Sequence, residues 1–203
     1  PLPTASMPDE MLGYVVQHRF RSAEGAWPLI QVGPGLLTLN DTRDYTWKTF
    51  EIKSQQLVDA LYSAYPDAPS SLQVSSLQLR YIDAIPFDFE RADVLRFLAD
   101  ELKITLAFAP NLFGDVPVNP TPKGLNAMFE FSTDNPLGTL RIRLARGRRH
   151  DSDAVILEMV LISEGADAPA MPASFATWLD AAHTVIHDTF FEMIKGDLED
   201  QFL

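Results

Sequence analysis

Residues 174–196 read SFATWLDAAHTVIHDTFFEMIKG, and this stretch has the clearest helical pattern of the chain. Its apolar side chains recur every three or four residues, which places them on one stripe of an α-helix. The stripe consists of Phe175, Leu179, Ala182, Ile186, Phe190 and Met193. Ser174 can cap the start of this helix and Gly196 can end it. The sequence therefore predicts a long C-terminal helix with one face on a core.

Upstream of this helix, three segments have the composition of β-strands. They are Ala127–Ser132, Thr139–Ala145 and Ala154–Ser163, and turn-rich linkers separate them. An earlier segment over residues 77–83 places Leu77, Leu79 and Tyr81 on one face of a strand. Alternation of this kind is typical of strands that cover a core on one side.

The first half of the chain contains a predicted hairpin and a predicted helix. Two extended segments over residues 27–40 flank the turn sequence Gly33-Pro34-Gly35. Residues 14–21 are rich in aromatic and β-branched side chains and predict a further strand. Residues 54–64 have helical spacing, with Ser54 as the expected cap, and this helix should stop before Pro66.

Residues 91–102 predict a second helix, and residues 109–124, which are rich in proline, predict a long loop. Strands and helices alternate only partly along the chain, so we expect an α+β fold and not a doubly wound parallel sheet. The predicted architecture is a mostly antiparallel β-sheet with helices packed on one face and a long C-terminal helix. We expect residues 1–13 to be a loose N-terminal lead-in and residues 14–203 to form a single α+β domain.

Composition excludes several classes of protein. The chain has 203 residues, a net charge of −12 and no cysteine, which excludes disulfides, thiolate nucleophiles and cysteine-ligated metals. No apolar run is long enough for a bilayer span, and the first residues do not resemble a signal peptide. We therefore expect a cytoplasmic protein without a cofactor. The negative charge argues against nucleic acid and membrane partners and suits a protein partner.

One flank of the C-terminal helix carries Asp180, His183 and His187 at positions i, i+3 and i+7. Two imidazoles four residues apart can bind one metal ion, with Asp180 as third ligand. A proton shuttle that pairs His187 with Asp188 or Asp180 is a second possibility. In the third interpretation the imidazoles lie at the boundary of the core and Asp180 is hydrogen-bonded to His183. We favour this packing role.

Arginines are concentrated in one predicted strand and the turn after it: Arg141, Arg143, Arg146, Arg148 and Arg149. Because side chains alternate along a strand, Arg141 and Arg143 share the face opposite Leu140 and Ile142. With Arg80, they could bind the phosphate or carboxylate of a small anionic ligand. Alternatively, these arginines pair with Glu130 and Glu158 on neighbouring strands.

The predicted loop suggests a further site. Phe108, Leu112 and Phe113 lie in or beside residues 109–124. They could belong to a lid or to a segment that docks on a partner. Exposed aromatic side chains there would favour docking.

Three pieces of the sequence, taken in order, resemble a sporadically distributed bacterial and archaeal family of uncharacterised proteins. They are residues 28–40, residues 80–83, and residues 178–191 with the pattern W-L-D-x-x-H-x-x-I-H-D-x-F-F. The resemblance implies no established activity, cofactor or catalytic residue. The patchy distribution of that family implies an accessory role, for example in defence or toxin neutralisation.

Together these observations favour a non-catalytic interaction or accessory protein that binds a protein partner or associates with itself. A sheet edge or the final helix could form a homodimer. Two alternatives remain open: a metal-assisted hydrolase that uses Asp180, His183 and His187, and a binder of a small anionic ligand.

Overall fold

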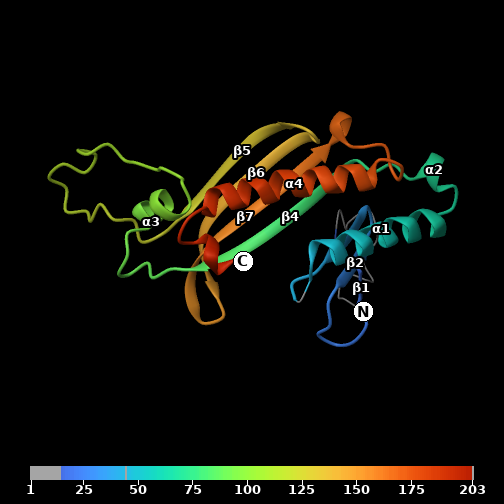
Figure 1. Ribbon diagram of the computed structural model, residues 1–203, viewed down its shortest axis with the longest axis horizontal. Helices are drawn as coiled ribbons and strands as arrows, with labels where there is room; N and C mark the ends of the chain where they lie inside the picture. Colours follow the sequence, from blue (N-terminus) through green and yellow to red (C-terminus); the bar gives the residue numbers. More distant parts are fainter. Residues whose placement is uncertain (1–14, 44, 203) are drawn as a thin grey trace. The chain divides into compact units, whose positions relative to one another are not determined.

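The computed structural model describes residues 15–43 and 45–202. The chain divides into two compact units, one up to Gln73 and one from Val74, and each is described by itself. Both contain an antiparallel sheet and helices (Figure 1), so the predicted α+β fold is confirmed, with the strands divided between two sheets. The predicted lead-in over residues 1–13 lies outside the described residues, and the single domain over 14–203 stays a prediction.

The first unit holds a sheet of order β1-β2-β3, in which neighbouring strands are antiparallel. β1 spans His18–Phe20, β2 spans Leu29–Gly33 and β3 spans Leu36–Asn40. Gly33 pairs with Leu36, so Pro34 and Gly35 form the tight turn, and Gly35 adopts the positive φ of 66° that this turn requires. The predicted hairpin is confirmed.

Helix α1 spans Trp47–Ala64 and begins earlier than the spacing predicts. Thr46 and Thr49 form a reciprocal capping box, in which each backbone N–H donates to the other side-chain oxygen. The prediction that Ser54 caps this helix is wrong. Ser54 lies within the helix, where its buried side chain donates to the carbonyl of Phe50 at 2.8 Å. The helix ends at Ala64, with Tyr65 as its C-cap, before Pro66 as predicted. The short helix α2, Ala68–Ser71, follows.

The second unit holds a sheet of order β4-β7-β6-β5, again antiparallel throughout. The strands are β4 (Ser76–Pro86), β5 (Asn126–Asp134), β6 (Leu137–Arg149) and β7 (Ser152–Glu164). All four predicted strands are confirmed and extend past their predicted ends. Helix α3, Val94–Glu101, is capped by the Asp93 carboxylate.

Helix α4, Phe175–Ile194, packs along β4 and β7 on one face of this sheet (Figure 1). The predicted stripe is confirmed, except that Phe190 is only half-buried, and Trp178 and Ile194 are buried as well. Ser174 occupies the N-cap position, but its side chain makes no capping hydrogen bond, so that part of the prediction is wrong. Gly196 follows the end of the helix as expected.

Two polar contacts fix which face of the sheet meets α4. The buried indole Nε1 of Trp178 donates to Ser163 Oγ on β7 at 2.8 Å, and Ser163 Oγ donates to the carbonyl of Leu137. Tyr81 on β4 meets His183 of α4. We call the face of the sheet that meets α4 the inner face, and the opposite face of the sheet the outer face. Since side chains alternate, Arg80, Glu158 and Arg143 lie on the outer face.

The C-terminal end of α4 is contacted by the side chain of Lys103, which lies outside the helix. Lys103 Nζ donates to the carbonyls of Glu192 and Lys195, at 2.8 Å each. Carbonyls in the last turn of a helix lack intrahelical partners, and the helix dipole favours positive charge there. Lys103 therefore caps α4. None of the helices among the described residues combines the length and apolar character that a membrane span requires.

Candidate functional site

The histidines of α4 form a line of rings beside β4. The rings of His183 and His187 have centroids 5.3 Å apart, and Phe191 continues the line at 4.7 Å from His187. His183 Nδ1 lies 3.0 Å from the hydroxyl of Tyr81, and His187 Nδ1 lies 3.0 Å from Asp188 Oδ1. The helix thus brings the predicted pair together, and Tyr81 is a partner that sequence spacing could not reveal.

The predicted metal set does not form a three-ligand cluster. Within the described part of the chain, no group of three or more His, Asp and Glu side chains is placed to hold an ion. Zinc sites in proteins use at least three such ligands. The structure therefore brings His183 and His187 together without Asp180 as the expected third ligand. The predicted His187–Asp188 pair does form, but both side chains are exposed, where such pairs contribute little.

Asp83 lies two positions from Tyr81 on the same inner face of β4, opposite Leu157. Burial raises the pKa of the Asp83 carboxyl above its usual value, because desolvation disfavours the charged form. An inward-pointing carboxyl on an edge strand is costly for stability.

The outer face carries an ion-pair network. Arg80 Nε lies 2.7 Å from Glu158 Oε1, and Arg143 Nη1 lies 3.5 Å from Glu158 Oε2. Arg141 Nε lies 2.8 Å from Glu130 Oε1. The alternative in which the strand arginines pair with these two glutamates is confirmed. An anionic ligand would have to compete with carboxylates already bound to the guanidinium groups, so the ligand-binding role of Arg80, Arg141 and Arg143 stays a prediction.

Arg146 serves a different purpose at the end of β6. It binds Asp153 and the carbonyl of Lys123, and its guanidinium lies 4.8 Å from the centroid of the Phe89 ring. The Arg146 backbone N–H also donates to the carbonyl of Leu125 at 2.8 Å. These contacts fasten the chain that enters β5 to the sheet.

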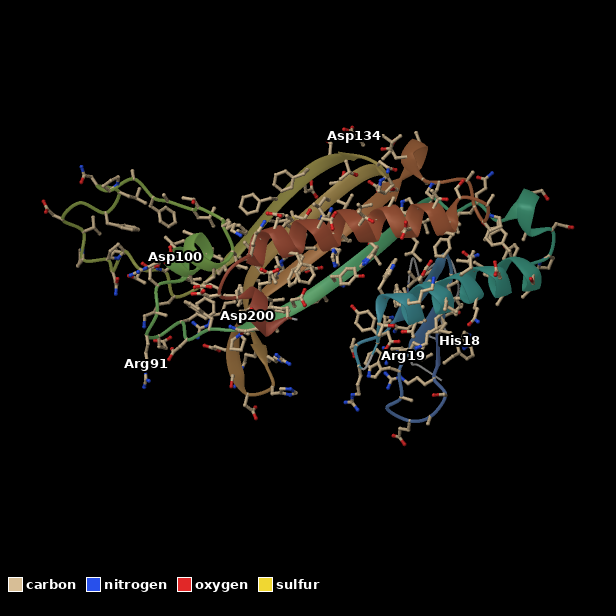
Figure 2. All side chains as sticks on the ribbon, in the orientation of Figure 1. His18, Arg19, Arg91, Asp100, Asp134 and Asp200 are labelled. Atoms are coloured by element: carbon tan, nitrogen blue, oxygen red, sulfur yellow. The ribbon has the colours of Figure 1, made fainter. Side chains whose placement is uncertain are left out.

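Residues 103–125, which we call the arm, connect α3 to β5 and contain neither a helix nor a strand. In Figure 1 the arm extends past the end of the four-stranded sheet of its unit. Four large apolar side chains of the arm are exposed: Phe108 (57%), Leu112 (55%), Val116 (59%) and Val118 (47%). Figure 2 shows arm side chains standing away from the ribbon. The condition that favours docking, an exposed aromatic side chain, is met by Phe108, whereas Phe113 is half-buried.

The two ends of the arm are fixed. Lys103 begins it and caps α4, and Lys123 Nζ forms an ion pair with Glu90 at 2.7 Å near its other end. Sequence reasoning named Phe108 and Leu112 and missed Val116 and Val118. Apolar residues in a loop carry no sequence signal that separates exposure from burial.

The first unit contains an open hollow of about 330 Å³. Its lining includes Lys53 and Asp41, whose side chains form an ion pair at 3.0 Å. The ion pair uses Asp41 Oδ2, whereas Asp41 Oδ1 is buried without a hydrogen-bond partner, and Arg43 also lines the hollow. We assign no chemistry to these groups.

Comparisons with known proteins give no family. No family model matches the chain, no curated protein is similar to it, and no solved structure resembles it. The resemblance to a family of uncharacterised proteins therefore stays a prediction.

Proposed function

We propose that this protein is a non-catalytic interaction protein that binds another protein through its arm. The observation that carries the proposal is the exposure of Phe108, Leu112, Val116 and Val118 on one loop. Scattered single apolar residues are normal on a protein surface, but several on one segment are typical of interaction sites.

The charge of the arm supports an apolar contact. The whole chain has a net charge of −12, yet Asp115 is the only charged residue between Lys103 and Lys123. A partner can therefore approach the arm without removing water from many charged groups, which would be costly. The complementary surface would be an apolar groove on the partner.

The backbone of the arm is partly organised in advance. Pro110, Pro117, Pro120 and Pro122 restrict its backbone dihedrals, and its ends are held by Lys103 and by the hydrogen bonds from Arg146 to the carbonyls of Lys123 and Leu125. Restricting a loop before binding reduces the entropy that is lost when the complex forms. The arm is thus better suited to docking than a free linker of similar length.

The experiment compares three forms of the tagged chain: wild type, Phe108→Ser/Leu112→Ser in the arm, and Ile52→Ser. Ile52 is a matched control, because it is 46% exposed but belongs to α1. Proteins captured from the source cells are identified by mass spectrometry, and the strongest candidate is then purified. Its affinity for each form is measured by calorimetry.

We expect the arm variant to bind the purified partner at least tenfold more weakly, a loss of about 1.4 kcal/mol, because a few residues at the centre of an interface carry most of the binding free energy. Ile52→Ser should bind as the wild type does. Equal affinity of all three forms would contradict the proposal. It would also fail if no captured protein binds once purified.

The cellular setting is a separate proposal. A defence or toxin-neutralising role and a cytoplasmic location both follow from the sequence-based expectations. Neither is needed for the arm to bind a protein.

A further inference from the structure

Strand β5 is an edge of the four-stranded sheet. Within the described residues its ladder partner is β6. The Arg146 N–H donates to the carbonyl of Leu125, the residue just before β5, so the backbone carbonyl of Leu125 points toward β6. Antiparallel pairs alternate, and therefore Asn126, Met128, Glu130 and Ser132 turn their N–H and C=O groups away from β6. These groups can accept another strand.

The two edges of the sheet differ in their protection. β4 carries the inward-pointing carboxyl of Asp83, ends in Pro86 and is covered on its inner face by α4. Such features discourage pairing with another chain. β5 has no proline, lysine or arginine along its length.

The side chains of β5 are unusually apolar for an exposed edge. Met128 is 57% exposed and Phe131 is 52% exposed. The charge of Glu130 is balanced by Arg141 on the neighbouring strand. Asp134 lies at the far end of β5, where the hairpin into β6 begins (Figure 2). An edge of this kind favours the addition of a strand.

We propose that two copies of this chain associate through β5, antiparallel across a two-fold axis at Phe129. The two four-stranded sheets then join into one continuous sheet, with each inner face continuing into the other. This interface is separate from the arm and goes beyond the proposed function, so either proposal can fail without the other.

The register follows from side-chain complementarity. With the axis at Phe129, Met128 lies opposite Glu130 of the other copy, and the two Phe129 rings form an aromatic pair. The large Phe131 then lies opposite the small Ala127. With the axis at Glu130, two like charges would be directly opposed, which is destabilising. The Phe129 axis therefore brings apolar groups together on the inner face, and on the outer face it keeps the two Glu130 carboxylates from lying directly opposite one another.

The first experiment measures the molar mass of the full chain by light scattering over a range of concentrations. Met128→Glu places a carboxylate directly opposite Glu130 of the other copy, and directly opposed like charges destabilise a strand pair. Ile82→Glu is the matched control, because Ile82 is 56% exposed and lies on the outer face of β4, in the same row of residues as Met128.

We expect the wild type and Ile82→Glu to form dimers with the same dissociation constant. Met128→Glu should raise that constant at least tenfold while the circular dichroism spectrum stays unchanged. A wild type that is monomeric at every concentration would overturn the proposal. An equal effect of the two variants would do the same.

The second experiment tests the register by disulfide trapping, for which the chain is suited because it has no native cysteine. Phe129→Cys should cross-link two copies on mild oxidation, since directly opposed residues in a non-hydrogen-bonded pair lie about 4.5 Å apart at Cα. Glu130→Cys should remain uncross-linked, because its counterpart lies diagonally, beyond ordinary disulfide reach. Cross-linking of Glu130→Cys but not of Phe129→Cys would refute the Phe129 axis. A failure of the arm experiment would leave both results unaffected.

Discussion

Replacing Ser163 by alanine should destabilise the second unit by removing the centre of a buried polar chain. Ser163 is fully buried, accepts a hydrogen bond from Trp178 Nε1 at 2.8 Å and donates to the carbonyl of Leu137. The Ser163→Ala variant loses one oxygen and changes the packing little. Its main effect is that the indole N–H and the carbonyl lose their partner.

The magnitude follows from the burial of these two groups. Leaving a buried donor or acceptor unsatisfied costs about 1–3 kcal/mol. Trp178 is only 5% exposed, so water cannot replace the lost partner of its N–H. The carbonyl of Leu137 lies at the hairpin end and its hydrogen bond with Ser163 is only partly buried, so we count the indole alone. The expected loss in the free energy of unfolding is therefore about 1–3 kcal/mol.

Urea denaturation followed by tryptophan fluorescence measures this loss in the second unit. Of the three tryptophans, Trp178 alone belongs to that unit, so a Trp27→Phe/Trp47→Phe background isolates its signal. Ser132→Ala is the control, because Ser132 is exposed on β5, and it should change stability by less than about 0.5 kcal/mol.

A double-mutant cycle with Trp178→Phe, followed by circular dichroism, separates the hydrogen bond from packing. Without the indole N–H, the cost of Ser163→Ala should fall by at least half. A cost for Ser163→Ala alone below about 0.5 kcal/mol, or an equal cost in both backgrounds, would refute the reasoning.

Three further predictions concern α4 and β4. Ile186→Ala should cost about 2–5 kcal/mol in urea melts, because Ile186 is 2% exposed at the centre of the helix stripe; a loss under about 1 kcal/mol would contradict the packing. Lys103→Met removes the cation from the end of α4 and should cost about 0.3–1 kcal/mol, with faster amide exchange in the last turn of the helix; unchanged exchange there would argue against capping. Asp83→Asn should stabilise the protein near neutral pH. The pKa of Asp83 is higher in the folded state than in the unfolded state, so its favourable contribution is fully present below the unfolded pKa and is lost as pH rises through the folded pKa. Stability measured from pH 3 to pH 7 should show the wild type and the variant converging at the acidic end and separating as pH rises, and parallel curves would contradict the assignment.

Local patterns in the sequence were sufficient to predict much of the fold. The spacing from Phe175 to Met193 predicted α4, and Gly33-Pro34-Gly35 predicted the β2–β3 turn. Both depend on residues close together in the chain. The start of α1 was missed because its capping box uses Thr49 at a position where glutamate or glutamine is the usual signal.

Long-range pairing limited the prediction of the site. The Arg141–Glu130 and Arg143–Glu158 pairs could be expected, because they join strands that follow one another along the chain. The contact of His183 with Tyr81 could not, since it depends on β4 lying next to β7 beneath α4. The division of the strands between two sheets also depends on pairing that periodicity does not encode.

The position of Lys103 has a mechanical consequence. Its backbone begins the arm while its ammonium group holds the last carbonyls of α4. A force applied to the arm would therefore reach the closing turn of that helix through a single flexible side chain. The same lysine joins the start of the arm to the end of α4, so a change at one would be transmitted to the other.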